Sequence, residues 1–119
     1  MARAILLVLS DVAPGADENE YNRWYNERHL PDVVRVKGYV AATRYRRSDV
    51  EILPGLPAPS NRYVAAYEVE AKDDGDLADA AAALRDALAA GEADISPTLD
   101  MATLQVAFFT PIAAVGAPE

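Results

Sequence analysis

Hydrophobic residues follow two different periods along the chain, and these periods predict four strands and two helices. Apolar residues run almost unbroken over 3–12, which is typical of a strand buried on both faces. Side chains alternate between two faces in 39–47 and again in 62–70. A fourth strand is predicted over 101–112, with one side formed by Leu104, Val106, Phe108 and Ile112.

Two other segments have the period of helices that bury one face. Asp17 and Glu20 match a capping box, so a helix is predicted to begin near Glu18. Pro31 is predicted to interrupt or end it, with an irregular turn over 32–36. One face of this helix carries Tyr21, Trp24, Tyr25 and Arg28, and His29 lies at its edge. A second helix is predicted over 77–90, stopped by Gly91.

The order strand, helix, strand, strand, helix, strand predicts an α+β fold of the ferredoxin-like type. Such a βαββαβ domain has a four-stranded antiparallel sheet with two helices on one face. We expect one domain over residues 1–119, with a Pro-rich loop at about 48–60 and a loose tail at about 113–119. Two helices cover only one face of the sheet, so a second copy of the chain is expected to cover the other.

Composition narrows the classes of function. The chain has 119 residues and a net charge of −8, which argues against nucleic-acid binding. The longest strictly apolar run has six residues (4–9), and no signal-peptide pattern precedes it, so a soluble cytoplasmic protein is expected. There is no cysteine and only one histidine, which excludes disulfides and thiol nucleophiles, and also a multi-histidine metal site within one protomer.

A resemblance to a known family covers the first two-thirds of the chain, to about residue 71. It is carried by YNRWYNERHLPDVVRVKGYVAATRYRR (21–47), with its W-Y-x-x-x-H-x-P run and Gly-aromatic strand, and by RYVAAYEVE (62–70). These segments resemble the EthD-like family of the dimeric α+β barrel superfamily.

The resemblance implies a homodimer formed by sheet-to-sheet packing, with a pocket in each protomer between sheet and helices. As a rule it also implies no metal or organic cofactor. Relatives include polyketide cyclases, dehydratases, lactone isomerases and cofactor-free monooxygenases, so the resemblance indicates the fold far better than the reaction.

His29 is the strongest candidate for catalysis, because imidazole exchanges protons near neutral pH. At a helix end, nearby carbonyls would favour its protonated form. The alternative is that His29 binds a backbone carbonyl and orders the turn around Pro31. Tyr25, one helical turn from His29, could assist it. Tyr63 and Tyr67 on the third strand could also assist it if their strand face is the one that the helices cover.

Five further residues are candidates for substrate binding: Trp24, Arg28, Arg44, Asp32 and Phe108. Trp24, Arg44 and Asp32 also have ordinary structural interpretations. The aromatic residues are more often core, Asp32 is more often a turn cap, and Arg44 with Arg46 is expected to pair with Glu68 or Glu70. The segment 21–47 nevertheless carries seven basic and two acidic residues, a local charge of +5 that would attract an anion.

The leading hypothesis is a cofactor-independent cyclase, dehydratase or isomerase. Its substrate would be a small aromatic, polyketide-like or lactone molecule, anionic or enolisable, with His29 as general base and acid. Three alternatives stay open: a non-catalytic small-molecule binder or accessory dimer, a cofactor-free monooxygenase, and haem binding through His29.

Overall fold

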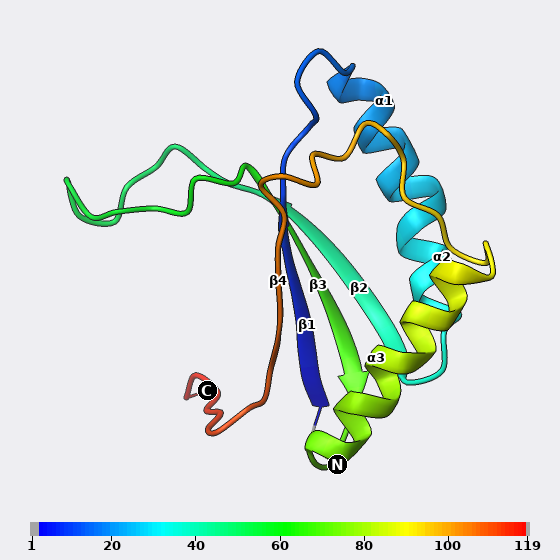
Figure 1. Cartoon of the computed structure of the whole chain (residues 1–119). Coiled ribbons are helices and arrows are strands. Elements are labelled where there is room, and N and C mark those ends of the chain that lie inside the picture. Colours follow the sequence, from blue (N-terminus) through cyan, green and yellow to red (C-terminus); the bar gives the residue numbers. More distant parts are fainter. Residues whose placement is uncertain (1–2, 119) are drawn as a thin grey trace.

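The computed structural model describes residues 3–118 and has one four-stranded sheet with its helices on one side (Figure 1). The elements are β1 (Arg3–Ser10), α1 (Glu18–Trp24), the π-helical turn η1 (Tyr25–His29), α2 (Leu30–Val34), β2 (Tyr39–Arg46), β3 (Tyr63–Glu70), α3 (Asp74–Ala89) and β4 (Gln105–Phe109). The strand order is β2-β3-β1-β4, and every neighbouring pair is antiparallel. The predicted ferredoxin-like fold is confirmed.

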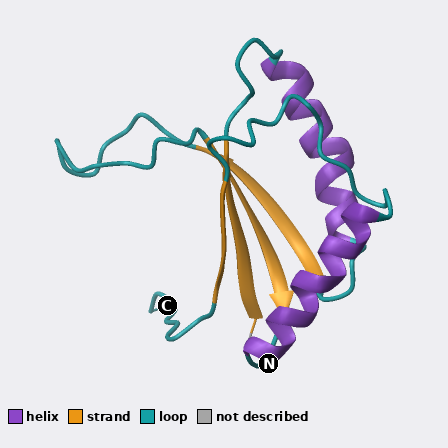
Figure 2. Ribbon diagram, in the orientation of Figure 1, coloured by secondary structure: helices purple, strands orange, loops and turns teal. Residues whose placement is uncertain are grey.

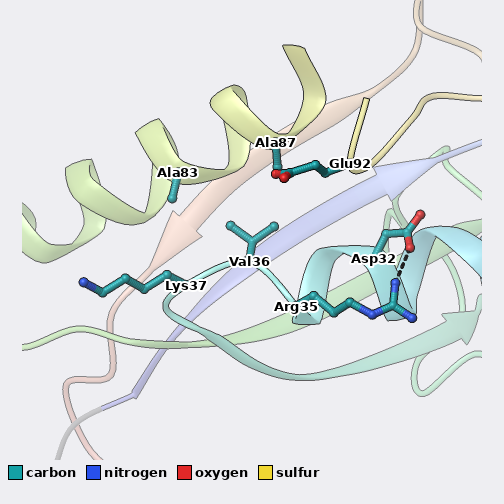
Figure 3. A pocket seen from close by; sticks show the side chains of 7 residues that line it. All are labelled: Asp32, Arg35, Val36, Lys37, Ala83, Ala87 and Glu92. Carbon is teal, nitrogen blue, oxygen red and sulfur yellow. Dashed lines mark hydrogen bonds and ion pairs between the residues drawn. The ribbon is translucent and has the colours of Figure 1, made fainter. Parts of the chain in front are cut away.

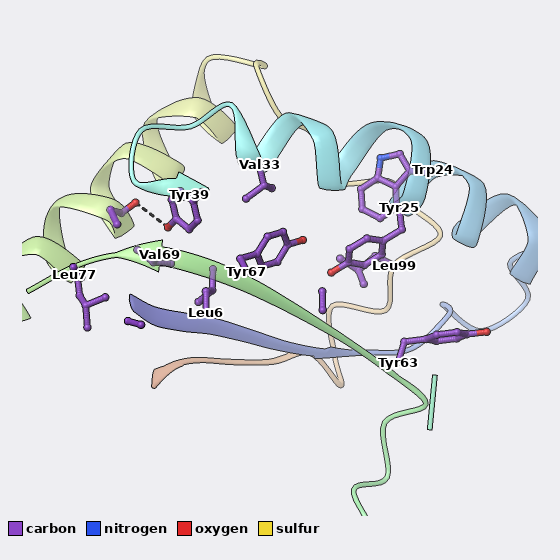
Figure 4. Close-up of a cluster of buried hydrophobic side chains, with 14 of the residues drawn as sticks. Leu6, Trp24, Tyr25, Val33, Tyr39, Tyr63, Tyr67, Val69, Leu77 and Leu99 are labelled. Atoms are coloured by element: carbon purple, nitrogen blue, oxygen red, sulfur yellow. Dashed lines mark hydrogen bonds between the residues drawn. The ribbon is translucent and has the colours of Figure 1, made fainter. Parts of the chain in front are cut away.

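The core lies between the sheet and the helices (Figure 4). On β3 the covered face carries Tyr63, Ala65, Tyr67 and Val69, all buried, and β1 contributes Ala4 and Leu6 from the adjacent register positions. The prediction that β1 is buried on both faces is wrong for the single chain, because Ile5, Leu7 and Leu9 on the opposite face are only partly buried. The helices supply no cover on that side (Figure 2).

A β-bulge changes which residues of β2 face the helices. Tyr39 pairs with Val69, yet Ala41 already pairs with Glu68, so the register shifts between them. The extra residue places Tyr39 on the same face as Ala42 and Arg44, whereas strict alternation had assigned them to opposite faces. Tyr39 is buried there, and its hydroxyl donates to the carbonyl of Ala80 on α3 at 2.9 Å.

The first helical run begins at Glu18 as predicted but does not end at Pro31. Asp17 caps it by accepting a hydrogen bond from the amide of Asn19 at 2.8 Å. The run then widens into the π turn η1 and continues as α2 to Val34. Pro31 therefore does not end the helix, and the regular α-helix is interrupted just before it. In the wide turn the amide of Leu30 donates a hydrogen bond to the carbonyl of Tyr25, five residues back. The wider turn lets the helix continue past Pro31.

The remaining elements are close to their predicted positions. Helix α3 starts at Asp74, three residues earlier than predicted, because the Asp73 side chain caps it by accepting a hydrogen bond from the amide of Asp76. It ends before Gly91, whose φ of +77° suits the predicted stop. Strand β4 is shorter than the predicted 101–112 and pairs only with β1. None of the helices in residues 3–118 combines the length and hydrophobicity needed to cross a bilayer.

Two irregular segments extend from the side of the sheet that faces away from the helices. The connection between β2 and β3 is a long arm, and the C-terminal tail turns to the same side (Figure 1). The arm exposes four large apolar side chains, and the tail exposes two: Val50, Ile52, Leu53, Leu56, Ile112 and Val115.

Candidate active site

His29 lies inside the continuous helical run and points into the core, with 8% of its surface exposed. Its ring stacks on Trp24, with centroids 4.8 Å apart, and meets the edge of Tyr25 at 5.1 Å. The wide π turn accounts for this contact, because it brings residues five apart onto one face of the helix. Nδ1 lies 3.2 Å from the backbone carbonyl of Asp94, in the loop after α3.

Burial lowers the pKa of His29 below its usual value of about 6.5. The Asp94 carbonyl and the charges of Asp94 and Asp32 raise it, and Arg44 lowers it, but burial has the largest effect. The prediction that helix-end carbonyls favour the protonated form is therefore wrong, since the helix continues past His29. A carbonyl accepts only, so Nδ1 carries the proton of the neutral ring and Nε2 keeps its lone pair.

Tyr25 and Tyr67 face each other across the core. One comes from the π turn and the other from β3, and their hydroxyls point toward one another in Figure 4. Burial raises the pKa of the Tyr67 hydroxyl, and the neighbouring Tyr25 raises it further. Burial likewise raises the pKa of Tyr25. Both hydroxyls therefore stay protonated at neutral pH and are proton donors.

Tyr63 lies at the other end of the covered face. Its ring is 5.4 Å from that of Tyr21, and its hydroxyl donates to the carboxylate of Glu18. The helices do cover the strand face that carries Tyr63 and Tyr67, as the hypothesis required. Only Tyr67, however, lies close to Tyr25. Tyr21 completes the group: its hydroxyl is 2.5 Å from Ser10 Oγ, and burial raises its pKa to about 12.

Arg44 reaches from β2 beneath the helical run. Its guanidinium carbon lies 4.1 Å from the ring centroid of Tyr25 and 5.0 and 5.2 Å from those of Tyr63 and Tyr21. Nη1 donates to the side-chain oxygens of Asn22 and Asn26 at 3.1 and 2.8 Å. The expected pairing of Arg44 with Glu68 or Glu70 is wrong, because those carboxylates lie on the opposite face, where Arg3 pairs with both.

Three polar atoms at this centre are buried without a hydrogen-bond partner: Nε and Nη2 of Arg44 and the hydroxyl of Tyr67. Buried polar groups are nearly always satisfied by protein, water or ligand, so such a group of three indicates a polar occupant. Tyr63 lines one shallow surface hollow, and Trp24 and Asp94 line another. His29, Tyr25, Arg44 and Tyr67 line none of the hollows described for residues 3–118, so this part of the site is closed in this conformation.

Solved structures of similar fold cover almost the whole chain. They include a protein of Shewanella loihica PV-4 described as a "putative monooxygenase" (19% identical, TM-score 0.55, covering 96% of this chain and 99% of that one). An Arabidopsis thaliana protein is 14% identical with a TM-score of 0.60, over 97% and 99% of the two chains. An EthD family protein of Bacillus halodurans C-125 is 13% identical with a TM-score of 0.57, over 94% and 100%.

The chain has the fold of EthD-like proteins. The fold that the sequence resemblance implied is thus confirmed. No protein-family model matches the sequence, and no curated protein is significantly similar to it.

Two predicted binding residues lie outside the closed site of this EthD-like fold. Arg28 is largely exposed and pairs with Asp94 at 3.7 Å, because the π turn gives the inward position to His29. Asp32 pairs with Arg35 at 2.7 Å and lines a separate cavity of about 420 Å³ between α2 and α3 (Figure 3). It contributes to the pKa of His29 but makes no hydrogen bond to it.

Two predicted aromatic residues have packing contacts. Trp24 is buried, stacks on His29 and donates from Nε1 to the side chain of Asp94 at 3.4 Å. Phe108 is partly buried against the core from the edge strand β4. Within residues 3–118 no three metal-ligating side chains gather at one point.

Sequence reasoning missed four residues of the site: Ser10, Asn22, Asn26 and Asp94. The two asparagines occupy i and i+4 on the same helical run, a spacing that could have indicated a pair reaching toward one partner. Asp94 acts through its backbone carbonyl, for which the sequence carries no signal.

Proposed function

We propose that this protein is a cofactor-independent enzyme that removes a proton from a small, enolisable aromatic or polyketide-like substrate, with His29 as the base. The single observation that carries the proposal is the state of His29: buried, neutral at physiological pH, and held through Nδ1 so that Nε2 keeps its lone pair. A base poised in this way accepts a proton from carbon next to a carbonyl, and the electron pair becomes an enolate.

The enolate carbon would then follow one of three courses. It would attack a second carbonyl of the substrate, whose oxygen takes the proton from His29 (cyclase), expel a β-hydroxyl that leaves as water with that proton (dehydratase), or be reprotonated by His29 at another carbon (isomerase). Tyr25 and Tyr67 support each outcome, because hydroxyls with raised pKa values donate hydrogen bonds to a developing oxyanion without losing their protons. Substrate entry requires the closed site to open.

The test is the exchange of α-protons for deuterium in a panel of aromatic ketones and 1,3-diketones, followed by NMR. His29→Asn keeps an amide donor for the Asp94 carbonyl but has no base, so exchange should slow by at least about 10²-fold. Arg28→Ala is the matched control, since this neighbouring side chain is exposed and should leave exchange unchanged. A His29→Asn protein that exchanges as fast as wild type would disprove the base assignment.

A second candidate is cofactor-free oxygenation, and the fold shared with the Shewanella loihica protein supports it. This reaction begins with the same deprotonation, after which the carbanion reacts with O₂. An oxygen electrode separates the two candidates, because only the oxygenase consumes O₂ with a hydroxynaphthalene probe. Saturable binding without exchange or oxygen uptake would instead support a non-catalytic binder.

We also propose that the active form is a homodimer in which a second copy covers the open face of the sheet. The arm and the tail support this arrangement, because both extend on that side and expose large apolar side chains. Sedimentation should give twice the monomer mass. Phe109→Glu, on the open face of β4, should give the monomer, whereas Glu20→Lys on the outer side of α1 should not.

A further inference from the structure

We propose that Arg44 and Tyr67 form a binding site for a planar anion with two neighbouring oxygens, either an aromatic carboxylate or the enolate of a 1,3-diketone. The inference rests on the proposed function for its place beside His29, and it adds the chemical class of the substrate. It concerns binding, so it can be tested without turnover.

One terminal nitrogen of the Arg44 guanidinium is hydrogen-bonded, and the two nitrogens that form its other edge are not. Asn22 and Asn26 take both of their hydrogen bonds from Nη1. Nε and Nη2, which form the opposite edge, are buried and without partners. That edge carries two parallel N–H donors, the arrangement that binds a carboxylate or a similar pair of oxygens bidentately. The asparagines are positioning residues, because they hold the guanidinium without using this edge.

The charge of Arg44 also lacks a counter-ion. No ion pair within residues 3–118 includes this side chain, although Arg3, Arg28 and Arg35 each have an acidic partner. Around it are the rings of three tyrosines, which attract the cation with their faces but cannot neutralise it. Because Arg44 is partly buried and two of its donors are fully buried without partners, it favours an anion over a neutral ligand.

Tyr67 supplies a further buried donor on the same face of the sheet. Arg44 pairs with Ala65 on the neighbouring strand, and Tyr67 lies two residues further along the same face, which makes the two side chains diagonal neighbours. The Tyr67 side chain is 1% exposed, and its hydroxyl has no partner. The aromatic walls favour a flat ligand, because ring faces stack on planar groups.

The first experiment compares benzoate with its neutral isostere benzamide by isothermal titration calorimetry. Wild type should bind benzoate about 10-fold or more tightly than benzamide, as expected where a carboxylate pairs with a guanidinium through two charge-assisted hydrogen bonds. Arg44→Gln should abolish this preference. Arg46→Gln is the matched control, since Arg46 lies on the same strand face but is exposed, and it should keep the preference.

The variant Tyr67→Phe tests whether a loss of benzoate binding comes from the loss of a donor or from misfolding. Removing a hydroxyl that has no partner leaves the packing intact, yet it should weaken benzoate binding about fivefold and leave benzamide binding unchanged. The enolate is tested with benzoylacetone, whose ionisation changes its ultraviolet absorbance. Binding should lower its pKa by about one unit in wild type but not in Arg44→Gln. A preference for benzoate over benzamide without a pKa shift of benzoylacetone would mean that the site binds carboxylates. A pKa shift of benzoylacetone without that preference would mean that the site binds enolates.

The outcomes separate this inference from the proposed function. His29→Asn should keep the preference for benzoate even where it loses proton exchange. Equal affinity for benzoate and benzamide, or no binding of either, together with no shift for benzoylacetone, would overturn the anion site. The three donors would then be satisfied by water, and His29 could still be the base.

Discussion

The two faces of the sheet carry different kinds of side chain, although the same strands supply both. The covered face combines tyrosines and an arginine with the histidine of the helical run. The open face presents aliphatic residues of β1 and, on the outer strands, the exposed rings of Tyr45 and Phe109. It is bordered by Arg3, Glu68 and Glu70. Two layers are needed to surround a small molecule with directed polar groups, whereas a smooth apolar face suits another protein surface.

The largest expected difference is between Leu6 and Leu7, neighbours on β1 that point to opposite faces. Leu6→Ala should cost about 2–5 kcal/mol of unfolding free energy, because the fully packed covered face cannot close the cavity. Leu7→Ala should cost about 1 kcal/mol or less in dilute solution, since Leu7 is already partly exposed.

Urea unfolding at two protein concentrations checks both values. The cost of Leu7→Ala should rise with concentration if a second copy covers the open face, while that of Leu6→Ala should not change. Equal costs for the two variants at every concentration would contradict the distinction between the faces.

The next effect concerns pH and belongs to the covered face alone. The folded pKa of His29 is below its unfolded value, so the unfolded chain takes up a proton first as the pH falls. The stability contributed by neutral His29 is complete above about pH 6.5 and is lost as the pH falls toward the folded pKa. Wild type should therefore lose stability relative to His29→Asn as the pH falls below about 6.5, as measured by urea unfolding. A parallel decline of the two proteins would show that His29 is not buried neutral.

The architecture could be predicted because it depends on patterns that repeat over many residues. The alternation of 62–70 correctly placed Tyr63, Ala65, Tyr67 and Val69 on one face of β3, although it left open which face the helices cover. Asp17 correctly marked the start of the first helix. These signals are local or periodic, and tertiary contacts reinforce them.

The site was harder to predict because two single-residue irregularities change which side chains face inward. The π turn moves His29 in and Arg28 out, and the bulge after Tyr39 brings Tyr39 onto the face of Arg44. Each is a local change in backbone hydrogen bonding, and the regular periods of helices and strands in the sequence do not predict such changes. Pro31 was the available signal for the π turn, since a proline within a helix requires such an adjustment.

A smaller effect of opposite sign is expected at Tyr67. Its hydroxyl is buried without a partner, which destabilises the free protein, so Tyr67→Phe should raise the unfolding free energy by about 1 kcal/mol. The matched control is Tyr39→Phe, which removes a hydroxyl that donates to Ala80 and should lower stability by a similar amount. Thermal unfolding measures both. Loss of stability in Tyr67→Phe would mean that an ordered partner, such as water, already satisfies the hydroxyl.

The smallest effect is expected at the border of the open face, where Arg3 pairs with Glu68 at 3.4 Å and Glu70 at 4.0 Å. These side chains are about half exposed, so Arg3→Gln should cost less than about 0.5 kcal/mol in the dilute monomer. A second copy on this face would remove water from the pair, and the loss of one partner would then leave a carboxylate poorly solvated. The cost should therefore grow with protein concentration if the dimer forms here. Comparison with Arg35→Gln, which breaks a surface pair on the helical side, separates this effect from a general change in charge, because that variant should show no concentration dependence.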